Sequence, residues 1–231
     1  MHPYSHIVIA SKLAALVKPG NLQEYYWGAV APDIRYAAAL PRQQTHIHSE
    51  RIFEAISQYP ELKPFLQGYL VHCLSDEIDL SQVFFQHFPF SVLKSKLSYQ
   101  QIAAIFELFN FENAKGNKNI SGSYNEFLQG LGLSETISAA FSQSIQQYIM
   151  ASSPQSSLPE LFQLMGLQND SRIDQYVAAA RSFQKDWLLK SSLFLGIRTG
   201  RISEQIVSMA AALYEQYART GVIRVPPHPQ L

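Results

Sequence analysis

One apolar stretch of the chain carries a histidine and an aspartate at a spacing suited to metal or acid-base chemistry. His72 and Asp76 stand four residues apart within residues 68–76. On an α-helix this spacing places both side chains on one face, about one turn apart, so an imidazole and a carboxylate can reach the same cation. A simple hydrogen bond between the two on a half-buried helix is the alternative, and the pair alone leaves both interpretations open.

Further groups of the same chemical kind gather in the N-terminal third. Asp33 follows a proline, and five of the seven histidines lie in the first 72 residues, namely His2, His6, His46, His48 and His72. Most of these groups have apolar neighbours, where an unpaired polar side chain would be costly. The presence of several such groups among apolar neighbours favours a shared cation over isolated hydrogen bonds. We expect His2 to be exposed and without a role.

The sequence shows helical periodicity and no run of alternating apolar and polar residues between hairpin turns, so helices must position these groups. The sequence predicts an all-α protein, a multi-helix bundle in which residues 1–231 form a single helical domain. Residues 1–80 would carry the metal ligands, and residues 81–231 would form the rest of the core and the pocket wall. The expected helices are 6–17, 49–58, 64–79, 99–111, 134–148, 173–188 and 206–217. Residues 25–33 mix aromatic and small residues and bring Asp33 to a turn or a helix start.

Four segments, in order along the chain, resemble the zinc-dependent phospholipase C family, of which the fungal single-strand-specific nucleases are distant relatives. They are residues 5–10, 28–33, 45–46 and 68–76. The resemblance covers about the first 80 residues, and beyond them only the helical character matches. It implies a helical bundle of the phospholipase C type that holds metal ions and hydrolyses a phosphoester.

The resemblance also implies roles for individual residues. One zinc would be held by Asp33, His46, His72 and Asp76. A further metal would be held by His6 and would share Asp76. The family's remaining site needs a further histidine and a His-x-x-x-Glu pair downstream of Asp76. Downstream, His87 is followed four residues later by Ser91, so we expect that metal to be absent. Iron or manganese would also suit imidazole and carboxylate ligands.

Three assignments complete the predicted site. Asp33 could also act as the general base on the attacking water, as the resemblance implies. Arg35 is a candidate for neutralising an anionic group. His48 lies two residues from His46 and is either a second ligand or an ordinary surface histidine, although the register of the family favours His46.

Composition limits the classes of partner. Lysine and arginine total 18, as do aspartate and glutamate, and charged residues make up only 16% of the chain, so binding of extended nucleic acid is disfavoured. The single cysteine, Cys73, excludes an internal disulfide and a multi-cysteine zinc site, and we expect it in the core. We find no signal peptide or transmembrane segment, which favours the cytoplasm. The aromatic residues within 84–90 leave peripheral contact with a membrane open.

The sequence therefore predicts a metal-dependent hydrolase that cleaves a phosphoester of a small hydrophobic or lipid-like substrate with metal-activated water. One alternative is a metal-dependent isomerase, cyclase or lyase acting on an apolar metabolite. Another is a non-catalytic helical protein with a residual metal site. No oligomeric state follows from the sequence.

Overall fold

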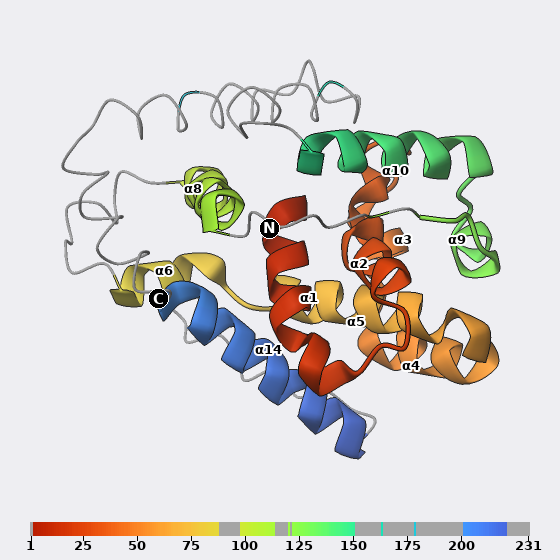
Figure 1. The fold of residues 1–231 in the computed structure, drawn as a ribbon, viewed down its shortest axis with the longest axis horizontal. Helices are drawn as coiled ribbons and strands as arrows, with labels where there is room; N and C mark the ends of the chain where they lie inside the picture. Colours follow the sequence, from red (N-terminus) through yellow and green to blue (C-terminus); the bar gives the residue numbers. More distant parts are fainter. Residues whose placement is uncertain are drawn as a thin grey trace.

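The computed structural model describes residues 2–87, 98–113, 120, 122–150, 163, 178 and 201–220. Over these residues the chain folds into helices joined by short connections (Figure 1). The α-helices are α1 (Pro3–Val17), α2 (Leu22–Val30), α3 (Arg42–Thr45), α4 (Ser49–Gln58), α5 (Lys63–Asp76), α6 (Leu80–His87), α8 (Tyr99–Asn113), α9 (Glu126–Gly130), α10 (Glu135–Met150) and α14 (Arg201–Thr220). Two short 3₁₀ helices, η1 (Ala31–Arg35) and η2 (Pro60–Leu62), precede α3 and α5.

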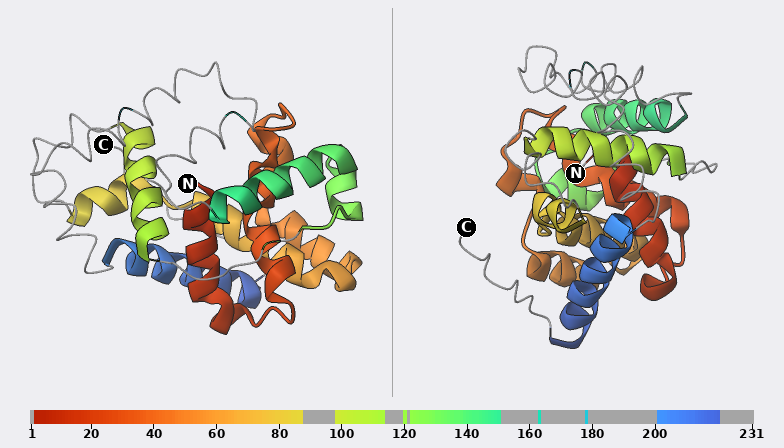
Figure 2. Two further views of the ribbon diagram at one scale, coloured as in Figure 1. Left: turned by 45° about the horizontal axis from the view of Figure 1, so that its top comes forward. Right: turned by 90° about the vertical axis from the view of Figure 1, so that its left-hand side faces the viewer.

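Helices α1, α2 and α5 form the middle of the molecule. Helix α10 lies on one side of them and α14 on the opposite side, as two views show (Figures 1 and 2). Helix α14 packs against α1, α5 and α6, while α8 packs against α1 and α6. This arrangement encloses the central helices, which carry most of the predicted metal ligands.

Two glycines allow α2 and α5 to approach at backbone distance, and these helices make the most extensive contact of any pair among the described elements. A methyl group added at Gly68 would lie 1.9 Å from the carbonyl oxygen of Tyr25. One added at Gly28 would lie 1.9 Å from the carbonyl oxygen of Phe65. Neither position has room for a side chain, so glycine is required at both for this crossing.

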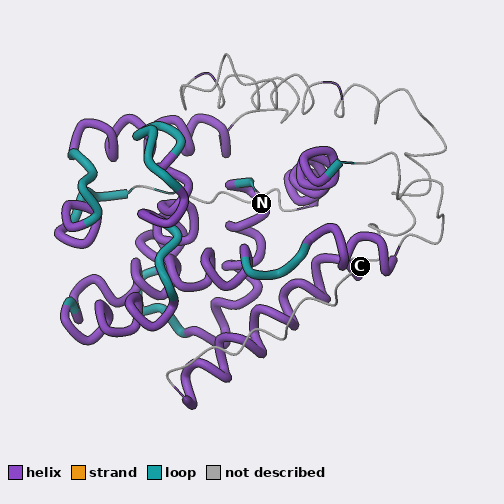
Figure 3. The backbone as a smooth tube through the Cα atoms, turned by 180° about the vertical axis from the view of Figure 1, so that it is seen from behind, coloured by secondary structure: helices purple, strands orange, loops and turns teal. Residues whose placement is uncertain are grey.

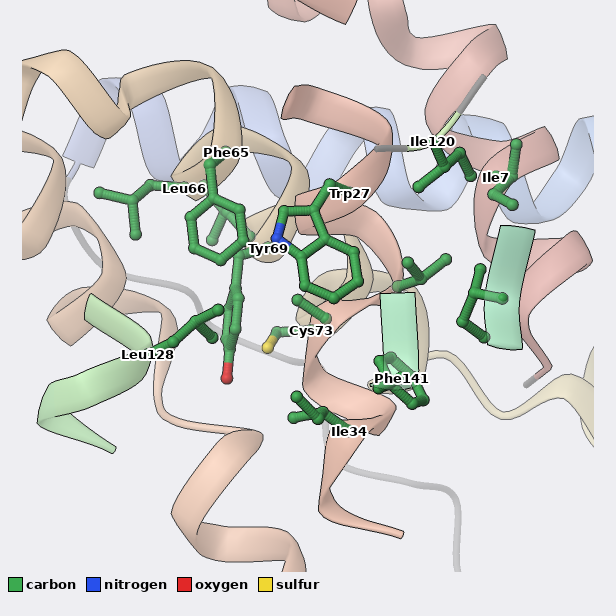
Figure 4. Close-up of a cluster of buried hydrophobic side chains, with 14 of the residues drawn as sticks. Ile7, Trp27, Ile34, Phe65, Leu66, Tyr69, Cys73, Ile120, Leu128 and Phe141 are labelled. Atoms are coloured by element: carbon green, nitrogen blue, oxygen red, sulfur yellow. The ribbon is translucent and has the colours of Figure 1, made fainter. Parts of the chain in front are cut away.

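The apolar core has two connected parts. The first surrounds Trp27, which packs against Phe141 and donates a hydrogen bond of 3.2 Å from its indole to the Ser123 carbonyl (Figure 4). The second contains Phe84 and Phe106, together with apolar residues of α1 and α14. Tyr26, Leu213 and Tyr214 pack against both parts. The two parts therefore make one continuous apolar environment around the central helices.

A buried carboxylate fixes the start of α1. Glu107, on α8, accepts hydrogen bonds from the backbone N–H groups of Tyr4 and Ser5 at 2.7 and 2.8 Å. It also accepts bonds from the Ser5 hydroxyl at 2.6 Å and the Tyr148 hydroxyl at 2.8 Å. The first N–H groups of a helix have no partner within it, and a negative charge there is favourable. Burial raises the pKa of Glu107, while the hydrogen bonds from Ser5 and Tyr148 act in the opposite direction.

The helical prediction is confirmed over the described residues, where Figure 3 shows helices and loops and no strand. Helix α4 spans the predicted range, and α5 ends at Asp76, three residues earlier than expected. Helix α2 was not predicted as a helix, and Asp33 follows it in η1. The predicted helix over 173–188 lies outside the described residues except for position 178, as do residues 88–90 of the aromatic segment.

Replacing Gly68 with alanine should strongly destabilise the protein. The added methyl group meets backbone atoms of α2, so the two helices must separate, at a cost of about 3 kcal/mol. Urea unfolding measures the change. Gly130→Ala is the matched control, because nothing lies within 4 Å of the added methyl group there. Equal stabilities of the two variants would contradict the close contact.

The variant Glu107→Gln should lower the free energy of unfolding by about 2 kcal/mol. An amide NH₂ group in place of one carboxylate oxygen faces the backbone N–H donors at the start of α1, and two donors cannot pair. Glu54→Gln, at an exposed position on α4, provides the comparison. A loss for Glu107→Gln no greater than for Glu54→Gln would show that the carboxylate does not hold α1.

Candidate metal centre

Five of the predicted site residues converge on one buried location. His6 comes from α1 and Asp33 from η1, while His46 follows the last residue of α3. His72 and Asp76 come from α5. Separate stretches of chain therefore supply the donors, and α5 supplies two of them.

The donors form two overlapping groups that share His72. In each group, one possible ligand atom of every member lies within 4.8 Å of the others. His6, Asp33 and His72 make the first group, and all three are buried. His46, His72 and Asp76 make the second. The resemblance had divided the residues differently, with Asp33 beside His46 and with His6 in a separate site.

Short distances connect the two groups. The Nε2 atoms of His46 and His72 are 3.1 Å apart. The Asp76 carboxylate lies 3.2 Å from His46 Nε2, 3.4 Å from His6 Nε2 and 3.8 Å from His72 Nε2. The rings of His6 and His72 stack with their centroids 3.7 Å apart. All three imidazoles thus present Nε2 to the same carboxylate.

The opposite nitrogen of each imidazole has a partner outside the cluster. His72 Nδ1 lies 2.8 Å from the carbonyl oxygen of Ala29, which is only an acceptor, so Nδ1 carries the proton and Nε2 offers a lone pair. His6 Nδ1 lies 3.0 Å from the Ser75 hydroxyl, and His46 Nδ1 lies 3.2 Å from the Thr45 hydroxyl. Partners of this kind orient metal-binding histidines in proteins.

The close crossing of α2 and α5 positions the central ligand. Ala29 follows Gly28 on α2, and His72 lies one turn beyond Gly68 on α5. The same contact that requires the two glycines therefore brings the Ala29 carbonyl within hydrogen-bond distance of His72. Tyr69, also on α5, donates its hydroxyl hydrogen bond to the Thr45 carbonyl and so holds the segment that carries His46.

Burial determines the charges of the cluster. It lowers the pKa of His72 to about 4, although Asp33 and Asp76 act in the opposite direction. Burial and the neighbouring His72 hold the pKa of His6 well below its usual value. Burial alone would raise the pKa of Asp76, but the positive charge of the N-terminal amine and the hydrogen bond from His46 outweigh it, so the pKa is well below normal. Neutral imidazoles around a carboxylate are the protonation states that metal binding requires.

The donor set fits a transition metal. Imidazole nitrogens and carboxylate oxygens suit zinc, iron or manganese. His6 Nε2 is buried without a hydrogen-bond partner among the described residues, and its nearest charged neighbour is Asp76 at 3.4 Å. The Nε2 atoms of His46 and His72 point toward each other at 3.1 Å. A bound cation would satisfy all three nitrogens.

The chain was compared with protein-family models, with curated proteins and with solved structures, and none of the three comparisons found a match. The arguments for function therefore come from the geometry of the cluster. Among the described residues, no helix is both long enough and apolar enough to span a bilayer.

Two predicted residues make no hydrogen bond or ion pair with the five donors in the part of the chain that the structure describes. The Arg35 guanidinium stacks on the Tyr36 ring, 3.8 Å from its centroid, and donates to the Tyr36 hydroxyl. His48 precedes α4 and belongs to neither group of donors, so of the two neighbouring histidines it is His46 that meets His72 and Asp76.

Two expectations concern residues near the cluster. The predicted exposure of His2 is wrong, because this residue is only 8% exposed where it precedes α1, and burial lowers its pKa to about 3. The prediction for Cys73 is confirmed, because it packs in the core. Burial raises the pKa of its thiol, which disfavours a thiolate nucleophile.

A hollow of about 300 Å³ lies against the cluster. It is lined by His46, Ile47, His48, Ser49, Glu50, Cys73, Leu74 and Glu77. His46 belongs both to this wall and to the donor set, so a molecule in the hollow would lie beside the metal ligands. The wall combines apolar side chains with two carboxylates.

Sequence reasoning missed Arg42. Its guanidinium Nη2 lies 3.0 Å from the Asp76 carboxylate. Arg42 is four residues before His46, the same spacing that singled out His72 and Asp76, but the short helix α3 was not expected. The Ser75 hydroxyl beside His6 was missed as well, because nothing in the sequence shows that α1 meets the end of α5.

The metal-free protein should lose stability as the pH falls from 7 to 5. The pKa of His72 is about 4 in the folded chain, against an ordinary value of 6.5 for histidine, so the unfolded chain binds more protons between these values. For His72 alone the free energy of unfolding should drop by about 2 kcal/mol over this interval. Urea unfolding in a chelating buffer at both pH values measures the drop.

The variant His72→Gln should show a smaller drop, and His87→Gln, a histidine on α6 outside the cluster, should retain it. An equal dependence on pH in the wild type and in His72→Gln would contradict a neutral, buried His72.

Proposed function

We propose that the chain is a metal-dependent hydrolase, with zinc as the metal, that cleaves a phosphoester of a small substrate with a hydrophobic part. The observation that carries the proposal is the convergence of His6, Asp33, His46, His72 and Asp76 on one place. The order of these residues along the chain, which resembles that of zinc-dependent phospholipases C, supports the choice of reaction.

The cluster suits hydrolysis because it combines ligands with a base. A bound zinc ion lowers the pKa of a water molecule to about 7 and polarises a phosphoryl oxygen. Asp33 is the general base in this proposal. This residue is only 5% exposed and stands beside His6 and His72, where its carboxylate can take a proton from water that enters the group. His46 and Asp76 remain as ligands on the other side of His72.

The adjoining hollow suits the hydrophobic part of the substrate. Ile47 and Leu74 supply an apolar wall, and the protonated thiol of Cys73 adds to it. A cavity of about 300 Å³ is at the lower end of the range for small-molecule sites. With His46 in its wall, the hollow would hold the substrate with its phosphoester toward the ligands.

Purified wild-type protein should contain at least one zinc, iron or manganese ion per chain and should hydrolyse a p-nitrophenyl phosphodiester. The variants His72→Ala and Asp76→Ala each remove a ligand, so metal affinity should fall by about 100-fold or more and turnover should be lost. Elemental analysis and release of nitrophenolate measure the two effects. His87→Ala, on α6, should keep both the metal and the turnover.

The two measurements separate the alternatives. A protein that takes up no metal contradicts the whole proposal and favours a non-catalytic helical protein. A protein that holds the metal but cleaves neither the phosphodiester nor phospholipid vesicles contradicts hydrolysis, and a metal-dependent isomerase, cyclase or lyase would then replace it.

A further inference from the structure

One charged side chain joins the candidate metal centre to solvent. The Arg42 side chain is 47% exposed, whereas the Asp76 side chain that it contacts is only 6% exposed. Arg42 Nη2 and His46 Nε2 approach the same oxygen of Asp76, at 3.0 and 3.2 Å. The guanidinium therefore lies at the boundary between the buried ligands and water.

Helix α3 fixes this position. The backbone N–H of His46 bonds to the Arg42 carbonyl at 2.7 Å, so the two side chains are one helical turn apart on one face. Gln44 donates to the Leu131 carbonyl at 2.7 Å, and Tyr69 donates to the Thr45 carbonyl. These bonds tie the segment to two other parts of the fold, so Arg42 is held beside the ligands.

The guanidinium retains donors for a further partner. It carries five N–H groups, and Asp76 is its one hydrogen-bonding or ion-pair partner among the described residues. A metal ion bound to Asp76 would take over part of the charge that Arg42 now neutralises. The Arg42 guanidinium would then lie close to an anion bound to the metal. Arginine binds phosphate oxygens in this geometry.

We propose that Arg42 binds the negatively charged oxygen of the phosphoester and so makes the site specific for anionic substrates. This inference rests on the proposed function. It replaces the expectation for Arg35, whose guanidinium lies on the Tyr36 ring. Among the described residues, Arg42 is the cation that contacts a ligand of the cluster.

Binding of inorganic phosphate to the zinc-loaded protein tests the inference without requiring turnover. Calorimetric titration should show binding to the wild type, and Arg42→Gln should weaken it by about 10- to 100-fold, the effect of losing a charged hydrogen bond. Arg42→Lys keeps the charge but not the forked donors, so an intermediate loss is expected. Arg51→Gln removes an exposed cation of α4 and should bind phosphate as the wild type does.

Zinc content, measured on the same samples, separates this inference from the proposed function. Zinc retained in Arg42→Gln together with weakened phosphate binding supports the role of Arg42, even if the wild type hydrolyses no phosphodiester. Unchanged phosphate binding in Arg42→Gln overturns it, as does a wild type that binds zinc but no phosphate. Loss of zinc from Arg42→Gln also overturns it, because Arg42 would then serve the ligands and not the anion. A wild type without zinc overturns the proposed function first, and this inference with it.

Discussion

The backbone contact between α2 and α5 is the constraint on which the site depends. Gly28 and Gly68 leave no space between the helices, so the Ala29 carbonyl lies 2.8 Å from His72. That bond determines which nitrogen of His72 carries the proton and turns the other toward Asp76. The packing of α2 against α5 thereby decides which nitrogen of the His72 imidazole is available to a metal ion.

The surrounding apolar core gives the cluster its electrostatic character. Burial holds the imidazoles of His6 and His72 neutral, while the Asp76 carboxylate stays ionised. The imidazole lone pairs and the Asp76 carboxylate lie together away from water, and this arrangement attracts a cation. Arg42 supplies a positive charge from the solvent side. Glu107 holds the start of α1, which carries His6, through bonds to Tyr4 and Ser5. The site therefore needs α8 although none of the five donors comes from it.

The sequence predicted the parts of this picture that depend on local spacing. Helices with one apolar stripe, such as α4, were recognised, and so was the pair His72 and Asp76. Helix α2 was not recognised, because residues 27–30 are all buried and leave no polar face to reveal its period. His6, Asp33 and His46 came from their order along the chain. Arg42 was missed because its ion pair with Asp76 depends on how α3 packs against the rest, which no spacing encodes.

The central claim is that imidazoles and carboxylates from α1, η1, α5 and the end of α3 hold one metal centre. X-ray absorption spectroscopy at the zinc edge of the purified protein tests it most directly. The account predicts nitrogen and oxygen neighbours at about 2.0–2.2 Å, together with the outer scattering of imidazole rings. A spectrum with sulfur neighbours at about 2.3 Å, or with no imidazole scattering, would contradict it.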